Sequence, residues 1–572
     1  MGVQLSNQKY LWDVKVPMRD GANLSANVFF PAGDGPFPVL LNRTPYIKDT
    51  ALRTKRVAEY TKAGYAVVHM DVRGRGNSED VFNPYFQEIE DGHDSIEWCG
   101  TQSWSTGKVG TYGGSYEGWT QIYPTRLQSK YHTAAFLICT PSMHPFREGI
   151  YWSGVPMPIM GMWTLFTSGK TNKEQIAELD WESVVNVRPL KDLMTRIGLP
   201  SSYRDEHYRH DRLDDYYKRL WYEGVLNQTI IPCYHVTGWF DDDQRGTLDH
   251  FPALALNHPD PNVRRNQKLL IGPWPHRLST DSSKLGDFDY GAHSMVPLTK
   301  EAIRWFDFWL KGIDNGITRE PRCRLFLMGA DANRWIETDT FPIAESKPRV
   351  FLLGANGPAN SLLGKGTLGD ARGASAASAL TFNPERPAPT PFWKENFQNG
   401  TNEDLRPIQR RDDVLVFTTE PLAAPLNIVG MLSAELYVST SATDTDFVAR
   451  LSDVAPDGYA QRLNAGIVRL RYRDGYEQPK LVKPGEIVQV TIDLWATGHQ
   501  FKAGHRVRLE VTSSAFPTWA PNFNTGGNVW EETTPIIAEN TVHHSAQYPS
   551  RLILPELPEP KFVDAWAESR WA

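Results

Sequence analysis

The first half of the chain carries continuous hydrophobic runs rather than alternating ones. Five of these runs predict strands: Phe37–Leu41, Tyr65–Met70, Ala134–Cys139, Ile230–Val236 and Lys268–Ile271. Runs without alternation are typical of strands buried on both faces of a parallel sheet. Segments with helical periodicity lie between several of them, at Arg53–Ala63, Ile89–Trp98 and Glu117–Leu127. This alternation of strands and helices predicts an α/β domain.

The hydrophobic pattern changes to a period of two after Arg322. Hydrophobic positions alternate with polar ones over residues 488–494, 507–511 and 468–472. In the last segment the intervening polar positions include Arg469 and Arg471. Strands with one polar face belong to antiparallel sheets, so this half predicts a β-sandwich or jelly roll.

Residues 145–228 interrupt the α/β pattern of the first half. They are rich in Met, Trp and Tyr and then in charged residues, and they predict a helical insertion. We therefore expect an α/β domain over residues 1–144 and 229–320, with a helical cap inserted at 145–228. An all-β jelly-roll domain is expected over 321–572.

Composition supports a folded protein and argues against a nucleic-acid partner. The 572 residues include 19 Trp, 22 Tyr and 25 Phe, which supply ample surface to bury, so disorder is excluded as the main state. The net charge is −7 and the pI about 6.1, so the basic footprint of a DNA- or RNA-binding protein is absent. The 44 Gly and 41 Pro indicate many turns, as a β-rich portion requires.

Cysteine spacing and the N-terminal sequence predict a cytoplasmic protein. The four cysteines, at 99, 139, 233 and 323, lie far apart and are expected to be buried residues in a reducing compartment. Residues 1–21 lack the basic region and apolar core of a signal peptide. The most apolar segment, 155–166, is too short to span a membrane and contains two prolines, so no membrane partner is expected.

The strongest local motif is G-T-Y-G-G-S-Y-E-G at residues 110–118. The motif follows a short hydrophobic segment and precedes a segment with helical periodicity. Small residues beside a serine are needed at a nucleophile elbow, because this sharp strand-to-helix turn is crowded and strained. A glycine-rich turn of purely structural use has the same local pattern. The predicted strand, turn and helix around it favour Ser115 as a nucleophile.

A serine nucleophile needs a base that is oriented by a carboxylate. In α/β hydrolases the acid and then the histidine follow the serine in the sequence. Asp241 follows the hydrophobic run 230–236, and His276 follows the run 268–271. Both lie at the carboxyl ends of predicted strands, where open α/β sheets build their sites. A solvated acidic turn and a turn histidine are the alternatives, and position and order together favour the catalytic assignment.

Several motifs in order resemble those of the cocaine esterase/NonD group of serine hydrolases. They include G-G-S-Y-E-G at 113–118, G-W-F-D at 238–241 and G-P-W-P-H at 272–276, and the similarity extends over essentially the whole chain. This group is related to the X-prolyl dipeptidyl peptidases and the α-amino acid ester hydrolases. The resemblance implies an α/β hydrolase fold with a helical cap, followed by a jelly-roll domain.

The resemblance also implies the roles of individual residues. Ser115 would be the nucleophile, His276 the base and Asp241 the group that stabilises the imidazolium. Tyr46, in the motif R-T-P-Y, would donate its hydroxyl to the oxyanion hole, and the backbone N–H of Tyr116 would be the second donor. The position of Tyr46 just beyond a predicted strand agrees with such a donor loop.

Substrate-binding residues are expected in the cap and beside the triad aspartate. Trp152, Met160, Trp163 and Phe166 would line an apolar acyl pocket, although helix packing explains each of them equally well. Amino-ester hydrolases of this family hold the substrate ammonium with a carboxylate cluster. Here Asp243 and Glu148 are the candidates, while Gln244 stands where a further acid is expected, so the cluster is partial.

The expected reaction is hydrolysis of a small-molecule carboxylic ester, or of an amide, through an acyl-enzyme on Ser115. An α-amino acid ester hydrolase or β-lactam acylase, an X-prolyl dipeptidyl peptidase and a non-catalytic glycan binder are the alternatives. No metal or organic cofactor is expected. The segment D-V-R-G-R-G at 71–76 lacks the full dinucleotide fingerprint and predicts a structural loop. A homo-oligomer is compatible with the sequence, which does not determine the oligomeric state.

Overall fold

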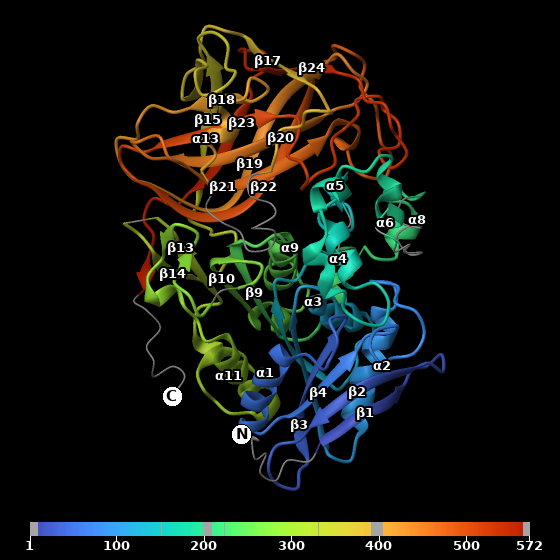
Figure 1. Cartoon of the computed structure of the whole chain (residues 1–572). Helices are drawn as coiled ribbons and strands as arrows, with labels where there is room; N and C mark the ends of the chain where they lie inside the picture. The colour runs from blue at the N-terminus through green and yellow to red at the C-terminus, as the bar shows by residue number, and fades with distance from the viewer. Residues whose placement is uncertain are drawn as a thin grey trace.

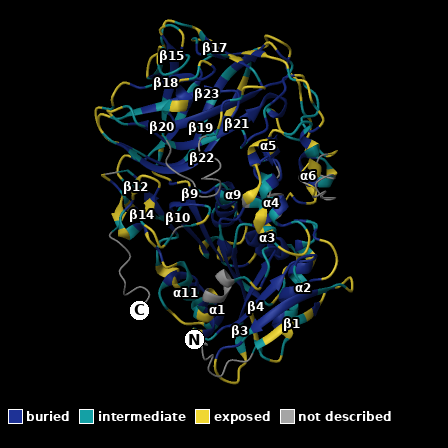
Figure 2. Ribbon diagram, viewed as in Figure 1, coloured by how far each residue is buried: buried dark blue, intermediate teal, exposed yellow. Residues whose placement is uncertain are grey.

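Two 11-stranded sheets form the framework of the chain, and short helices lie beside the junction between them (Figure 1). The structure is a computed structural model that describes residues 10–142, 144–149, 151–196, 198, 209–221, 223–278, 280–329, 331–390 and 404–563. In Figure 2 the strands of both sheets are largely buried, whereas exposed residues gather in loops and on outer helical faces.

The first sheet has the strand order β1-β2-β4-β3-β5-β6-β9-β10-β13-β14-β26. Its strands are β1 (Tyr10–Pro17), β2 (Asn23–Phe29), β3 (Phe37–Thr44), β4 (Ala66–Asp71), β5 (Ser105–Gly114), β6 (His132–Ile138), β9 (Cys233–Phe240), β10 (Gln267–Pro275), β13 (Cys323–Leu327), β14 (Arg334–Thr338) and β26 (Phe562–Val563). The strands from β4 to β13 in this order pair in parallel, and the edge strands pair antiparallel. The central strands β4 and β10 are buried at every position, as the continuous hydrophobic runs predict.

Helices connect the parallel strands as the sequence predicts. They are α1 (Ala51–Lys62), α2 (Glu88–Thr101), α3 (Tyr116–Ile122), α9 (Gln244–Ala255), α10 (Pro261–Arg265) and α11 (Leu298–Lys311). Helix α11 buries Trp305, Phe306 and Leu310, and it ends at Gly312, whose φ of 74° closes the helix in the left-handed region. The carboxyl ends of β5, β9 and β10 therefore meet at one edge of a helix-covered sheet.

The insertion between β6 and β9 is built from short helices and one small hairpin. Its elements are β7 (Tyr151–Trp152), β8 (Val155–Pro156), α4 (Met160–Phe166), α5 (Trp181–Val185), α6 (Leu193–Arg196) and α8 (Asp215–Lys218). Figure 1 shows α4 next to α3 and α5 next to the second sheet. The predicted helical cap is thus present over the described part of the insertion.

The second sheet forms the β-rich C-terminal part. It contains β15 (Lys347–Ala355), β16 (Gly366–Gly369), β17 (Ala377–Phe382), β18 (Leu415–Thr418), β19 (Leu426–Thr440), β20 (Asp446–Val454), β21 (Ala460–Arg469), β22 (Val488–Phe501), β23 (Arg506–Thr512), β24 (Ala538–His543) and β25 (Arg551–Glu556). Almost every pairing is antiparallel, with β16–β18 parallel. Most of its buried side chains form a hydrophobic core of their own, while a few, among them Val429 and Ile467, belong to the core of the first sheet. The all-β character is confirmed, and the jelly-roll topology stays a prediction.

Two details differ from the sequence prediction. Strands β13 and β14, which follow the predicted boundary at residue 320, continue the first sheet next to β10, and the boundary itself stays a prediction. In addition, β21 ends at Arg469 and residues 470–472 form a 3-10 turn, not a strand with a polar face. The reason is ion pairing, because Arg469 and Arg471 are buried against Asp446 (2.8 Å) and Asp444 (2.6 Å).

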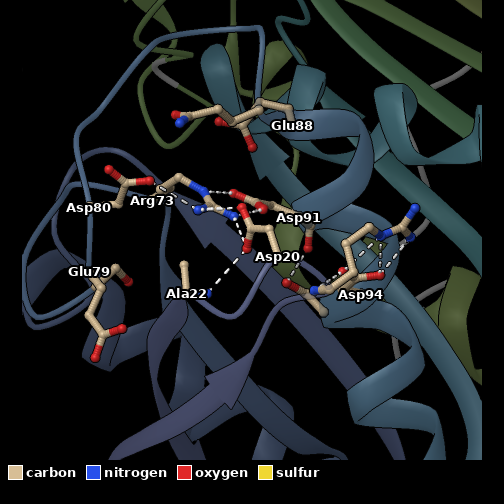
Figure 3. Close-up of polar contacts among 12 residues, drawn as sticks. Asp20, Ala22, Arg73, Glu79, Asp80, Glu88, Asp91 and Asp94 are labelled. Carbon is tan, nitrogen blue, oxygen red and sulfur yellow. Dashed lines mark hydrogen bonds and ion pairs between the residues drawn. The ribbon is translucent and has the colours of Figure 1, made fainter.

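The loop after β4 is structural, as the sequence predicts. Figure 3 shows Arg73 at the centre of an acidic cluster, where its guanidinium donates to both oxygens of Asp91 at 2.9 and 2.6 Å. Asp80 and Asp20 each accept from it at 3.1 Å. Since Asp91 belongs to α2, this network fixes the loop to the helix that also carries Glu88.

None of the helices in the described part of the chain combines the length and apolar character that crossing a bilayer requires. The four cysteines are buried and unpaired, in agreement with the sequence prediction.

Candidate active site

Ser115 occupies the turn between β5 and α3 with a strained backbone. Its φ is 59°, a left-handed value that is uncommon for a residue with a side chain. Two backbone hydrogen bonds hold the turn: the Ser115 N–H donates to Ile138 O at 2.9 Å, and the Gly118 N–H donates to Ser115 O at 2.7 Å. This is the geometry of a nucleophile elbow, in which the serine hydroxyl projects from the sheet edge.

The glycines of the motif make this turn sterically feasible at two positions. A Cβ at Gly118 would lie 2.2 Å from Thr140 Oγ1, and one at Gly113 would lie 2.5 Å from Glu117 Cβ at a φ of 149°. At Gly114 a Cβ would make only ordinary contacts with Ile138. The turn therefore requires glycine at positions 113 and 118, whereas the steric requirement for glycine at position 114 is weaker.

Asp241 and His276 meet beyond the ends of β9 and β10. His276 Nδ1 lies 2.8 Å from Asp241 Oδ1, and the Thr237 hydroxyl donates to Asp241 Oδ2 at 2.6 Å. The Asp243 N–H also donates to Asp241 Oδ1, at 3.0 Å. Burial raises the pKa of Asp241, but the neighbouring His276 and these hydrogen bonds outweigh it, so the pKa falls below its usual value. In the neutral form of His276, an ionised Asp241 keeps the proton on Nδ1 and leaves Nε2 as the acceptor.

The serine hydroxyl contacts Tyr46 and Asp243 in this structure. Its Oγ lies 3.3 Å from the Tyr46 hydroxyl and donates to Asp243 Oδ2 at 3.4 Å. Within the described residues no hydrogen bond joins Ser115 to His276. Asp243 lies between them, with Oδ2 also 3.5 Å from His276 Nδ1. Ser115 and His276 are therefore linked in this structure through Asp243.

Three consecutive carboxylates surround His276. Its Nδ1 is 2.8 Å from Asp241, 3.3 Å from Asp242 and 3.5 Å from Asp243. Burial lowers the pKa of His276, but the charges of Asp242, Asp243 and Asp241 outweigh it and raise the pKa to about 10. The imidazole therefore keeps its proton to a higher pH than an ordinary histidine.

Glu148 joins this acidic cluster from the start of the insertion, where the sequence analysis placed a candidate carboxylate. Its Oε2 accepts from the backbone N–H groups of Ser142 and Gly246, each at 3.1 Å, and its side chain contacts Asp243. Burial raises the pKa of both Glu148 and Asp243 well above the usual range. Both carboxyl groups therefore hold their protons to a higher pH than exposed carboxyl groups do.

Tyr46 lies at the serine, held by the cap and by the loop after β4. The indole N–H of Trp163 donates to its hydroxyl at 3.1 Å, and Asn172 donates to its carbonyl oxygen at 3.1 Å. Arg75 donates to the carbonyl oxygen of Pro45 at 2.7 Å. Burial raises the pKa of Tyr46 to about 12, so the hydroxyl keeps the proton that an oxyanion donor needs.

Tyr116 begins α3, so its backbone N–H lies at the helix N-terminus beside Ser115. Its side chain points into a buried network: the hydroxyl donates to Glu88 Oε1 at 2.8 Å and accepts from the Tyr85 N–H at 2.9 Å. Glu88 in turn pairs with Arg43 at 2.9 Å. The Tyr116 side chain thus anchors the elbow to α2 and β3.

The four predicted cap residues divide into two pairs. Trp163 stacks on Tyr116 at 5.8 Å between ring centroids, and Phe166 lies 6.4 Å from the Tyr46 ring. Trp152 stacks instead on Trp495 of the β domain at 4.0 Å. Trp152 belongs to the hydrophobic core that joins the hydrolase and β domains, and the partly buried Met160 packs against this core. Trp163 and Phe166 therefore contact residues beside Ser115, whereas the contacts of Trp152 and Met160 lie in the core between the domains.

Sequence reasoning missed several groups that support the site. Thr237 and Cys139 both contact Asp241, and Gln244, which stands where a further acid was expected, bridges the two domains. Its amide donates to Gly238 O at 3.0 Å, and its Oε1 accepts from the Ala496 N–H at 3.1 Å. The positions of Thr237 and Cys139 at strand ends were the signal available in the sequence.

Cys139, Asp241 and His276 offer ligand atoms within 4.8 Å of one another. Burial raises the pKa of the Cys139 thiol well above its usual value, and metal ligation needs the thiolate. Asp241 and His276 already bind each other, so this group fits a hydrogen-bonded site better than a metal centre.

The comparisons with known proteins agree with this geometry. Residues 20–277 match the model of the X-Pro dipeptidyl-peptidase (S15) family, and residues 315–553 match that of the X-Pro dipeptidyl-peptidase C-terminal non-catalytic domain. A cocaine esterase of Rhodococcus sp. (strain MB1 Bresler) is 33% identical, with 95% of this chain and 98% of that protein covered.

Two solved structures share the fold. An α-amino acid ester hydrolase superposes with a TM-score of 0.84 at 23% identity, covering 97% of this chain and 98% of its own. An aminopeptidase from a marine sediment Thaumarchaeota archaeon has a TM-score of 0.83 at 24% identity, with 97% of each chain covered.

The fold and the elbow define an α/β-hydrolase-type enzyme with a helical cap and a C-terminal β domain. Identity over nearly the whole of both sequences then gives the family. The chain belongs to the cocaine esterase (CocE/NonD) family of serine hydrolases.

The raised pKa of His276 predicts an alkaline activity profile. Because only the neutral imidazole accepts a proton, activity is lost as pH falls through the pKa, so kcat/KM for a neutral ester should still rise above pH 8. Asp242→Asn removes one nearby charge and should move the profile to lower pH. Asp215→Asn, at a fully exposed position of α8, is the control and should leave the profile unchanged. A wild-type plateau already reached by pH 7 would contradict this electrostatic picture.

Proposed function

We propose that this serine hydrolase of esters works through an acyl-enzyme on Ser115, with His276 as the base and Asp241 as the group that orients and stabilises the imidazolium. Tyr46 and the Tyr116 N–H would form the oxyanion hole. The observation that carries the proposal is a strained serine that contacts the Tyr46 hydroxyl and, through Asp243, the Asp241–His276 pair at the ends of β9 and β10.

The proposed cycle has two acyl transfers. The Ser115 oxygen attacks the ester carbonyl carbon while His276 Nε2 takes its proton, and the negative charge on the carbonyl oxygen is stabilised by the two donors. The imidazolium then gives the proton to the leaving alcohol as the C–O bond breaks. Water repeats both steps on the acyl-enzyme and releases the acid. Before attack, rotation about one side-chain bond of Ser115 must redirect its hydroxyl proton from Asp243 to His276.

Covalent labelling tests the nucleophile. A fluorophosphonate probe should label the wild-type protein, and Ser115→Ala should abolish both labelling and hydrolysis of p-nitrophenyl acetate. Ser129→Ala, a serine on a partly buried loop outside the site, should label like the wild type. Persistent labelling of Ser115→Ala would refute the assignment.

Trp163 has a second role in this proposal, as the residue that positions the oxyanion donor. An indole N–H can only donate, so the Tyr46 oxygen accepts from Trp163 and its own proton is directed to Ser115 or to the substrate oxyanion. The pocket-lining role expected from the sequence requires only the ring, not the N–H.

A double-mutant cycle separates the two roles. Tyr46→Phe should lower kcat by about 10²–10³-fold. Trp163→Phe keeps an aromatic ring and should lower kcat by about tenfold with little change in KM, because the oxyanion donor loses its orientation. In the Tyr46→Phe background the same Trp163→Phe change should have almost no further effect on kcat. Equal effects in both backgrounds would contradict the positioning role.

An α-amino ester substrate is the second candidate, favoured by the cluster of Asp242, Asp243 and Glu148. A substrate ammonium would favour ionisation of the Asp243 and Glu148 carboxyls, whose pKa burial raises, and buried charge pairing of this kind gives strong discrimination. A p-nitroanilide of Ala-Pro tests the X-prolyl peptidase alternative in the same assay. Membership of a serine hydrolase family removes the glycan-binding alternative as the main function.

Comparing an α-amino ester with its N-acetylated form decides this point. If the cluster binds ammonium, kcat/KM should favour the free amine by about tenfold or more, and Asp243→Asn should reduce that preference. Asp331→Asn, at an exposed loop position, is the matched control. Equal rates for the two esters would exclude amino-ester specificity while leaving the esterase proposal intact.

A further inference from the structure

A cavity of about 240 Å³ lies where α9 and the start of the insertion meet the β domain. Its lining comprises Arg147, Ser153, Arg245, Ile467, Val468, Tyr472, Arg473, Gly475, Tyr476, Thr491, Asp493 and Trp495. In Figure 1, β21 and β22 form the face of the β domain nearest α9. The described lining includes none of the residues to which the reaction is assigned above, so the cavity is distinct from the serine site.

Positive charge exceeds negative charge around this cavity. Arg147 and Arg245 both pair with Asp249, at 3.4 and 2.9 Å, and Arg245 also pairs with Asp493. Arg473 differs from them, because its Nη1 donates to the carbonyl oxygens of Leu470 and Lys480 at 2.9 and 2.6 Å.

Carbonyl partners fix the Arg473 guanidinium without neutralising it. No carboxylate of the described residues lies within ion-pair distance of Arg473. Arg147 and Arg245 thus have carboxylate partners in Asp249 and Asp493, whereas the partners of Arg473 among the described residues are backbone carbonyl oxygens. A guanidinium held in place at a cavity wall is the usual donor for a carboxylate, since its planar fork matches the two oxygens.

One wall of the cavity is aromatic and strained. Trp495 lies within β22 at a register shift of its pairing with β19 and has a φ of 61°, which is a rare value for a bulky residue. The Asp493 carboxylate accepts from its N–H at 2.8 Å, and its ring stacks on Trp152 at 4.0 Å with 8° between the planes. Tyr472 and Tyr476, 6.0 Å apart, add two further rings to the lining.

Backbone strain that the surroundings maintain is concentrated at functional positions. Here it places an indole in the wall of a cavity that Arg473 also lines. The cavity therefore offers both a cationic group that can bind an anion and a flat apolar surface, and its volume is somewhat below the ~300–1,000 Å³ of sites for larger ligands.

We propose that this cavity is a second binding site, which takes a small aromatic monocarboxylate. The carboxylate binds the planar fork of Arg473, and the positive charges of Arg147 and Arg245 add to its attraction. The aromatic ring packs against Trp495 and Tyr476. Such acids belong to the class of products that ester hydrolysis releases. An acid can therefore bind in this cavity while the serine site stays open to substrate.

Calorimetric titration of the full-length protein with benzoate tests the proposal. Arg473→Gln should raise the Kd by about tenfold or more, because a charge-assisted hydrogen-bond pair is lost. Arg473→Lys keeps the charge and loses the fork, so its Kd should lie between the two. Arg319→Gln is the control, since Arg319 is two-thirds exposed and pairs with Asp314 on the surface, and it should bind like the wild type.

Further measurements separate this site from the serine site and from a folding defect. Enzyme that has been inactivated at Ser115 by a fluorophosphonate should bind benzoate with an unchanged Kd, whereas loss of binding would place the acid in the serine site and overturn the proposal. The same Kd in wild type and Arg473→Gln would also overturn it. Inorganic phosphate should bind more weakly than benzoate, and equal affinity would contradict the proposed packing of an aromatic ring in the cavity. Unchanged circular dichroism and p-nitrophenyl acetate hydrolysis of both Arg473 variants show that the protein is folded.

Discussion

The backbone of Ser115 has a φ of 59°, and holding a non-glycine residue there costs on the order of 1–3 kcal/mol. The surrounding structure maintains this strain through the parallel pairing of β5 and β6 and through the hydrogen bond from Ser115 N–H to Ile138 O. Tyr116 reinforces it by tying the first turn of α3 to Glu88 and Arg43 in the buried interior. Because the turn is fixed, the serine oxygen projects toward Tyr46 and the acidic loop.

Electrostatics around His276 place a second constraint on the site. A single carboxylate would be enough to orient the imidazole, yet three lie within 3.5 Å of Nδ1. Their combined charge favours the imidazolium that forms during acyl transfer, and for the same reason it makes the resting histidine a reluctant base. A cationic substrate group beside Asp243 and Glu148 would change this balance again. Substrate preference and pH dependence are therefore linked through the same side chains.

Much of this arrangement could be predicted from the sequence because it depends on local patterns. Continuous hydrophobic runs located the buried strands, and the order of Ser115, Asp241 and His276 followed from their positions at strand ends. The contact of Trp163 with the Tyr46 hydroxyl could not be predicted, since it depends on how the cap packs over α3. The burial of Arg469 could not be predicted either. The alternating pattern indicated a solvated face, but Asp446 on another strand forms an ion pair with this side chain. In both cases long-range packing decided the role of a side chain.

The position of Asp243 between the serine and the histidine makes direct trapping of the acyl-enzyme the most informative measurement. Wild-type protein mixed rapidly with p-nitrophenyl acetate, quenched in acid and digested should yield an acetylated peptide whose modification maps to Ser115 by mass spectrometry. The account predicts that this adduct appears during turnover and disappears when the ester is exhausted. Turnover with no adduct on Ser115 across the quench times, or a turnover-competent adduct on another residue, would contradict it.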